Sequence, residues 1–200
     1  MQVLKVVGTK IEFQKLKTFK FFILLLLSIS ISTSYAQIDS VFINDANIWG
    51  QKISVRYLKS GVKKLASKKM LGRETSSKGE QAAIKYITKK LKSYKLEPLG
   101  FNYIQSFYTG FSSKKKNDYY SYSDSAFNII GFIKGSVKPD EAIIISGHYD
   151  HLGKTSKGIY FGADDNGSGI SSILEIVRIF KLAEAKGFKP YRSIIFLFFS

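Results

Sequence analysis

The chain is 200 residues long, which suits one domain or part of a larger one, and its apolar fraction of 44% is ordinary for a globular core. It contains no cysteine, which excludes disulfides, thiolate zinc sites and a cysteine nucleophile. The formal net charge is +16, from 31 basic and 15 acidic residues, but the lysines are scattered and no arginine-rich helix or single-strand-binding motif occurs. We therefore interpret the charge as a lysine-rich solvated surface and predict no nucleic-acid partner.

The segment at 1–36 has the pattern of an export signal. Its lysines, the last of them Lys20, precede an apolar stretch of about twelve residues, and Ser34 and Ala36 place small side chains just before Gln37. A membrane-spanning helix needs about 20 apolar residues, so we predict cleavage rather than a retained membrane anchor. This interpretation divides the chain into a signal peptide at 1–36 and a mature part at 37–200, exported to the periplasm or the extracellular space.

The first half of the mature chain predicts helices followed by a strand. Apolar residues at helical intervals between Ile38 and Leu71 indicate one or two helices. Ser77 and Glu80 form a capping-box pattern at the start of a further helix that should end near Lys95. Residues 101–109 alternate loosely and predict a strand, whereas the polar segment 112–125 predicts a hairpin tip or a mobile loop.

The second half predicts strands around one helix. Residues 126–133 are a strand candidate, and the unbroken apolar run at 143–146 predicts a strand buried on both faces. From Ile170 to Phe180 the apolar positions share one face of a helix, and 193–199 predict another buried strand. Strand, helix and strand in this order imply a right-handed crossover. The predicted fold class is therefore α/β, with a mixed, mainly parallel sheet flanked by helices.

The candidate chemistry lies between that buried strand and the helix at 170. His148, Asp150 and His151 follow the strand, and Asp164 and Asp165 stand at the helix entrance. An imidazole and a carboxylate at the carboxyl edge of an α/β sheet indicate a metal site, because zinc at hydrolytic sites takes these ligands and keeps a position open for water. His148 is the first candidate ligand and Asp165 the second. Asp150 is placed to orient the His148 ring through its other nitrogen.

Plainer interpretations of the same residues stay open. His148 and His151 also suit an ordinary turn, and Asp164 and Asp165 also suit caps of the following helix. A zinc pair made of His148 and His151 is a further hypothesis, but the intervening turn leaves no obvious third ligand. The ligand types alone also admit cobalt or manganese.

Four blocks of sequence stand in a fixed order. They are Gly72–Thr75 (GRET, followed by a Lys-Gly-Glu helix start), Asn128–Gly131 (NIIG), Ser146–Gly153 (SGHYDHLG) and Gly162–Gly169 (GADDNGSG). The blocks resemble the secreted di-zinc exopeptidases related to aminopeptidase Y, bacterial leucyl aminopeptidases and glutamate carboxypeptidase, and the resemblance covers roughly residues 60–200. It implies a three-layer αβα fold, with 37–200 as the N-terminal part of a zinc exopeptidase catalytic domain.

The resemblance implies a role for each site residue. His148 corresponds to the histidine that binds one zinc, and Asp165 corresponds to the aspartate that bridges two zincs. Asp150 corresponds to a catalytic carboxylate that supports the site without binding metal. The resemblance also implies a cis peptide bond between Asp165 and Asn166.

The resemblance further implies that the domain is incomplete. The family continues after the strand at 193–199 with a Glu-Glu pair, whose first member is the general base and whose second member binds zinc, and later with another acidic ligand and a second histidine. After Asp165 this chain has only Glu175 and Glu184 as carboxylates, and no histidine. We therefore expect the second zinc site to be incomplete, and the 200-residue piece to be inactive alone.

For the parent protein we expect an exported zinc-dependent aminopeptidase that acts on peptides and holds two Zn²⁺ ions per complete catalytic domain. The alternatives are a carboxypeptidase, a glutaminyl-cyclase-like relative, or a catalytically inactive remnant or binding module of the same fold. We expect no stable membrane anchor after signal cleavage. Neither the residue preference nor the oligomeric state follows from the sequence.

Overall fold

The structure, a computed structural model, describes residues 47–115 and 118–200. Every element described below belongs to the unit Trp49–Ser200. The predicted signal peptide at 1–36 lies outside the described residues. Among the described helices, none combines the length and the apolar character that a bilayer crossing requires.

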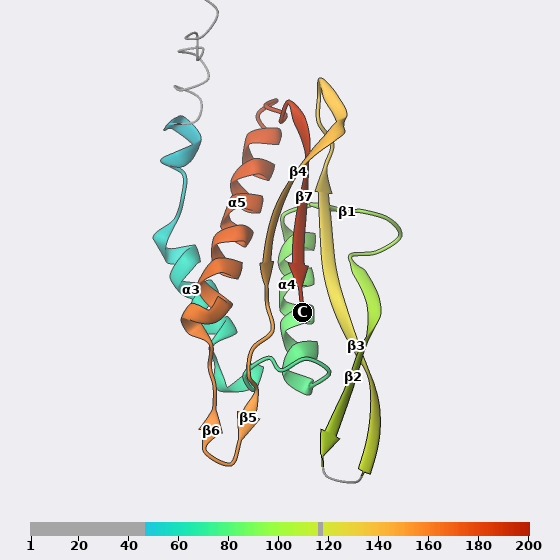
Figure 1. The fold of residues 1–200 in the computed structure, drawn as a ribbon. Helices are drawn as coiled ribbons and strands as arrows, with labels where there is room; N and C mark the ends of the chain where they lie inside the picture. Colours follow the sequence, from blue (N-terminus) through green and yellow to red (C-terminus); the bar gives the residue numbers. More distant parts are fainter. Residues whose placement is uncertain (1–46, 116–117) are drawn as a thin grey trace, which may run out of the picture. The chain divides into compact units, whose positions relative to one another are not determined.

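A mixed five-stranded sheet forms the centre of this unit (Figure 1). Its strands lie in the order β1 (Glu97–Pro98), β3 (Asp118–Ile133), β7 (Arg192–Phe199) and β4 (Lys138–His148), and β2 (Ile104–Lys115) pairs with β3. The predicted strand–helix–strand unit is confirmed, since β4 and β7 pair in parallel. The other described pairs are antiparallel. The prediction of a mainly parallel sheet is thus wrong for the described strands, because β3 joins β7 antiparallel and brings its hairpin partner β2 with it.

Helices α4 (Lys78–Ser93) and α5 (Gly169–Glu184) cover one face of this sheet, and α3 (Val55–Leu65) packs on α5. On β7, Ile194, Phe196 and Phe198 face the helices and are buried. Ile195, Leu197 and Phe199 point to the other face and are less buried. The α/β class, with a mixed sheet and flanking helices, is confirmed. The second helical layer of the expected three-layer fold is not among the described residues.

The start of α4 follows the capping-box prediction in part. Ser77 Oγ accepts hydrogen bonds from the backbone N–H groups of Gly79 at 3.0 Å and Glu80 at 3.2 Å. Glu80 does not return a bond to Ser77, because its Oε2 accepts the N–H of Ser76 at 2.8 Å instead. The predicted apolar face of the helix is buried in the core.

Strand β4 differs from its prediction. It is the edge strand of the described sheet, and Ile143 and Ile144 are 51% and 60% exposed. An edge strand lacks a neighbour on one side, and the described helices cover only one face of the sheet, whereas Ile144 pairs with Ile195 on the other face, so an unbroken apolar run is not by itself a sign of burial on both faces. The prediction of a doubly buried strand is wrong for the described residues.

The polar segment 112–125 is mostly strand rather than loop. β2 extends to Lys115 and β3 begins at Asp118, so the two strands pair through most of the segment, and 116–117 lie outside the described residues. A polar composition does not oppose this pairing, because an antiparallel ladder satisfies the backbone groups whatever the side chains are. The hairpin of the prediction is present, but its strands are longer than expected.

Glu175 and Arg178 tie α5 to the segment just before α3. Glu175 Oε1 accepts the backbone N–H of Ser54 at 2.7 Å, and Arg178 donates to both Glu175 oxygens and to the carbonyl of Lys52. Burial by itself raises the pKa of Glu175. The hydrogen bonds from Arg178 and Ser54 outweigh that effect, so the pKa lies below its ordinary value.

Replacing Glu175 by glutamine should lower the free energy of unfolding at pH 7 by about 2 kcal/mol, the typical value of a hydrogen bond to a charged group. Because the folded-state pKa is lowered, this contribution is present above the unfolded-state pKa of about 4.3 and is lost as the pH falls through the folded-state value. Urea titrations at pH 7 and pH 3 should show a smaller difference from wild type at pH 3. Glu184→Gln is the control, with a loss below about 1 kcal/mol because its partner Lys181 is a partly exposed neighbour on the same helix. Equal differences at both pH values would contradict the charge-based origin.

Candidate metal centre

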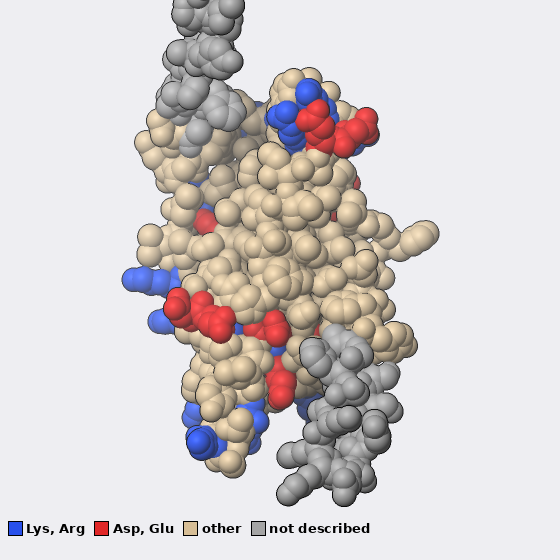
Figure 2. Space-filling view, viewed as in Figure 1, with Lys and Arg blue, Asp and Glu red and all other residues tan. Residues whose placement is uncertain are grey.

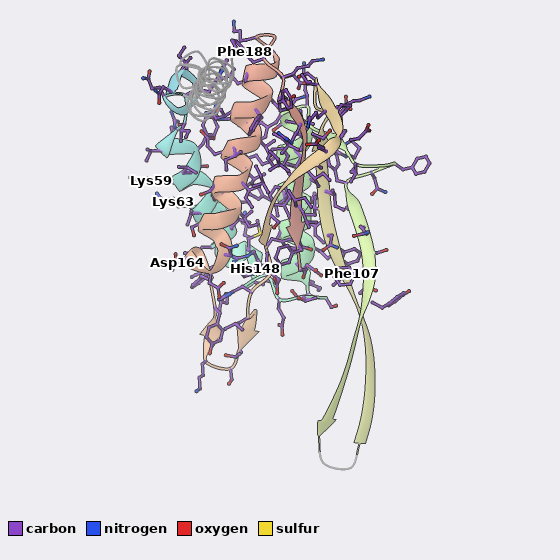
Figure 3. The ribbon with its side chains drawn as sticks, turned by 45° about the horizontal axis from the view of Figure 1, so that its top comes forward. Lys59, Lys63, Phe107, His148, Asp164 and Phe188 are labelled. Atoms are coloured by element: carbon purple, nitrogen blue, oxygen red, sulfur yellow. The ribbon has the colours of Figure 1, made fainter. Side chains whose placement is uncertain are left out.

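The candidate site lies where β4 ends and α5 begins. His148 is the last residue of β4, and the wide helical turn η3 (Ala163–Ser168) leads directly into α5. Figure 3 shows His148 and Asp164 at the same end of these two elements. Gly162 precedes the turn with φ of +55°, and a Cβ there would collide with the Asp165 carbonyl. Glycine is therefore needed for the turn to close beside the strand end.

The side chains of His148 and Asp165 face each other across this edge. His148 Nε2 lies 3.1 Å from Asp165 Oδ1, and the two side chains are 37% and 67% exposed. An imidazole nitrogen and a carboxylate oxygen thus converge from two elements on a place that solvent can reach. The structure brings together the two residues that the sequence nominated as metal ligands.

Asp150 lies on the other side of the His148 ring. Its Oδ1 is 3.2 Å from His148 Nδ1, and its Oδ2 accepts a hydrogen bond from Thr75 Oγ1 at 3.4 Å. The contact on Nδ1 leaves Nε2 directed at Asp165. The geometric expectation for Asp150 is met, and Thr75 is an anchor of Asp150 that the sequence did not reveal.

His151 also reaches Asp165. Its Nδ1 lies 3.4 Å from Asp165 Oδ2, so the two imidazoles contact opposite oxygens of one carboxylate. The sequence left a His148–His151 pair open without a third ligand, and in the structure Asp165 stands between the two rings. Within the described residues, however, no group of three or more His, Cys, Asp or Glu side chains is arranged to hold a metal ion.

The helix-capping interpretation of Asp164 and Asp165 is wrong. The N-cap residue of α5 is Ser168, and no side chain caps that end of the helix. The Asp165–Asn166 peptide bond is cis, as the resemblance implies. Asn166 Nδ2 donates to the His148 carbonyl at 3.3 Å, which ties the turn to the end of β4. Both aspartates therefore belong to the turn rather than to the helix.

A buried polar pair beneath the site had no predicted role. Tyr149 is fully buried, and its hydroxyl lies 2.7 Å from the Phe127 carbonyl and 3.1 Å from Glu80 Oε1. Burial, and next the charge of Glu80, raise the pKa of Tyr149 above its ordinary value. Since successive side chains at the end of a strand point to opposite sides, an aromatic residue between His148 and Asp150 is the signal that such an anchor exists.

Charge is distributed unevenly around the site. The hairpin of β5 (Lys154–Thr155) and β6 (Gly158–Ile159) lies next to η3. Figure 2 shows a group of acidic side chains near η3, directly above the basic side chains of this hairpin. A hollow elsewhere, beside α4, is lined by five lysines, Lys64, Lys69, Lys85, Lys89 and Lys90. None of the candidate ligands lines that hollow, so it is not the site nominated by the sequence.

Comparison with known proteins supports the resemblance. The sequence profile of peptidase family M28 matches residues 128–200. The probable aminopeptidase YDR415C of Saccharomyces cerevisiae is 36% identical over 77 residues, which cover 37% of this chain and 21% of that protein. The probable glutamate carboxypeptidase LAMP1 of Arabidopsis thaliana is 35% identical over 68 residues, which cover 34% of this chain and 9% of that protein.

A solved structure supports the fold alone. The glutaminyl cyclase of Fimbriiglobus ruber superposes with a TM-score of 0.54 at 14% identity, over 74% of this chain and 45% of that chain. This chain spans at most 21% of the length of the two curated relatives above and less than half of that structure. The profile match covers three of the four blocks on which the resemblance rests, so residues 128–200 are similar to peptidase family M28.

Proposed function

We propose that the parent protein is an exported zinc-dependent exopeptidase and, within that class, an aminopeptidase. The match of residues 128–200 to peptidase family M28 supports a peptidase. The observation that supports a metal site is the distance of 3.1 Å between His148 Nε2 and Asp165 Oδ1. The aminopeptidase assignment draws on the yeast relative, which is named a probable aminopeptidase.

The residues at the site fit zinc in part. Zinc takes imidazole nitrogen at about 2.0 Å and carboxylate oxygen at about 2.0–2.2 Å, and His148 and Asp165 offer one donor of each kind. Because Asp150 lies against Nδ1 of His148, the Nε2 atom is the one presented to a metal. A complete catalytic centre needs further ligands, and none is grouped with these among the described residues. The proposal of two Zn²⁺ ions per complete catalytic domain therefore requires ligands that these residues do not supply.

A zinc ion held there would supply Lewis-acid polarisation of the scissile carbonyl and a water molecule of lowered pKa. The chain's own residues orient the ligands. Asp150 holds the His148 ring in position, and His151 faces the second oxygen of Asp165. The Asp165 side chain is 67% exposed, so solvent reaches the site.

Asp150→Asn should lower the zinc affinity of the full-length gene product by about 10–100-fold, as for other groups that orient a metal-binding histidine. The amide can still contact the ring, but it has no charge to strengthen the donor on the other ring nitrogen. Competition against a chromophoric chelator measures the change. Asp140→Asn, the same replacement at an exposed position within β4, is the control and should leave the affinity at the wild-type value. An unchanged affinity in Asp150→Asn would remove Asp150 from the proposed site.

The activity itself is tested on the full-length gene product with two substrates, an aminoacyl-anilide and an N-blocked peptide with a free carboxyl end. We expect hydrolysis of the anilide alone. A chelator should abolish this activity, and added zinc should restore it. Hydrolysis of only the blocked peptide would favour the carboxypeptidase alternative, which the Arabidopsis relative supports by its name. Cyclisation of an N-terminal glutamine would favour a cyclase. No turnover of any substrate would favour an inactive binding module.

Export and partners are part of the same proposal. The lysines and apolar stretch at 1–36 support cleavage before Gln37 and a periplasmic or extracellular location, without a retained anchor. The scattered lysines support a solvated surface without a nucleic-acid partner, and the family match supports a peptide as the substrate. N-terminal sequencing of the secreted protein should begin at Gln37, and a membrane-retained protein that still carries 1–36 would contradict cleavage.

A further inference from the structure

Arg73 lies beneath the candidate metal centre and is completely buried. It stands in the short segment between η2 (Lys68–Met70) and α4, in a left-handed backbone conformation with φ of +54°. Among the described residues it forms no ion pair with a carboxylate. Burial therefore lowers the pKa of its guanidinium, although the charges of Asp150 and Asp165 act in the opposite direction. A buried arginine in this position needs another source of stabilisation.

Main-chain carbonyls provide that stabilisation. A guanidinium has five N–H donors in a fixed planar arrangement, and in Arg73 all five have a carbonyl acceptor. Nε donates to Tyr149 at 2.7 Å, and Nη1 donates to Leu65 at 2.6 Å and to Phe161 at 2.9 Å. Nη2 donates to Gly162 at 2.8 Å and to Asp165 at 3.4 Å. One side chain thus joins three separate segments of the chain.

Two of those segments carry the candidate ligands. The Tyr149 carbonyl belongs to the residue after His148, and the carbonyls of Phe161, Gly162 and Asp165 belong to the loop and turn that present Asp165. The backbone of Arg73 adds a further link, because its carbonyl accepts the N–H of His151 at 3.1 Å. The third segment, through Leu65, is the end of α3, which anchors the assembly to the core.

We propose that Arg73 is the positioning residue of the metal centre: its guanidinium sets the spacing between the His148 and Asp165 loops before any metal binds. The inference rests on the proposed function in that it takes His148 and Asp165 as ligands. Lysine cannot replace Arg73 in this role, because its three donors diverge from a single nitrogen and cannot reach carbonyls on three segments. The guanidinium itself does not touch the candidate ligand side chains in the described contacts, so it acts through the backbone alone.

The test compares Arg73→Lys with Arg178→Lys in the full-length gene product. Arg178 also donates to several oxygens, but it lies nine residues along α5 from Gly169, about 14 Å at the helical rise. Arg73→Lys should lose about 10–100-fold in zinc affinity, the range for groups that orient ligands, and Arg178→Lys should stay within about twofold of wild type. Both are measured by chelator competition, alongside thermal unfolding of the zinc-free proteins. In Arg73→Lys, hydrogen exchange of the zinc-free form should speed up at 149–153 and 161–167 while the α5 amides stay protected.

Wild-type zinc affinity in a folded Arg73→Lys protein would overturn the proposal. So would an Arg73→Lys protein that fails to fold even with zinc, since Arg73 would then serve general stability rather than the two loops. A further test uses the wild-type protein alone. In the zinc-free wild type, the amides of His151 and Gly153, which donate to Arg73 and Gly72, should exchange as slowly as those of α5. Rapid exchange there would contradict positioning before metal binding. If the wild type binds no zinc, the proposed function fails, and the exchange data still test the positioning role.

Discussion

A His148→Ala form of the full-length gene product should lose more than about 100-fold in zinc affinity, beyond the 10–100-fold range of groups that merely orient a ligand. His148 Nε2 is one of the two donors that converge at the site, and alanine leaves Asp165 Oδ1 without its partner at 3.1 Å. The ring is partly exposed, so the free energy of unfolding of the zinc-free protein should change by less than about 1 kcal/mol. Chelator competition and urea titration separate the two quantities.

His151→Ala is the matched control for that experiment, because it removes the same ring from the other oxygen of Asp165. Its contact is longer, at 3.4 Å, and its side chain is only 11% exposed. We expect a loss of zinc affinity of about 10-fold, at the low end of the range for an orienting group. A large loss of zinc affinity in His151→Ala combined with none in His148→Ala would mean that His151 is the ligand instead of His148, and would contradict the proposed centre.

A Phe196→Ala form should lose about 3–5 kcal/mol in the free energy of unfolding, the range for removing a large buried aromatic side chain. Phe196 is completely buried at the centre of β7, and its ring meets that of Phe180 of α5 edge-on, with centroids 6.3 Å apart. Removing it leaves a cavity between the sheet and the helix that positions the η3 turn. β7 also pairs in parallel with β4, the strand that ends at His148. We therefore expect the zinc affinity of this variant to fall only under conditions in which the protein begins to unfold.

Phe199→Ala provides the comparison within the same strand. Phe199 is 38% exposed, so the same chemical change should cost less than about 2 kcal/mol. Urea unfolding at one pH and temperature measures both variants. Equal losses in the two would show that the helical face of β7 is not the core of this unit.

The parts of the fold that the sequence predicted are those governed by local rules. Ser77 marks the start of α4 because a cap acts within one turn of the helix, and the periodic positions from Ile170 define the buried face of α5. The exposure of Ile144 could not be predicted, because it depends on which strand lies at the edge of the sheet and on which face the helices cover. The extent of the β2–β3 hairpin was missed for a related reason, since backbone pairing is indifferent to the polar side chains of 112–125.

The candidate site divides in the same way. His148, Asp150 and Asp165 are recognisable because their residue types suit a metal and they stand at a strand end and a helix entrance, and the structure brings all three together. Arg73 had no such signal. Its five acceptors are backbone carbonyls on three segments, and a carbonyl is present at every residue, so no pattern of side chains identifies them. Only the folded chain shows which carbonyls meet.

The most direct test of the account is a crystal of the full-length gene product grown with zinc and measured at the zinc absorption edge. We expect an anomalous peak within about 2.0–2.2 Å of both His148 Nε2 and an Asp165 carboxylate oxygen, the usual lengths of zinc bonds to these ligands. An anomalous peak that lies away from either residue, or density that leaves His148 and Asp165 in direct contact while zinc occupies another site, would contradict it.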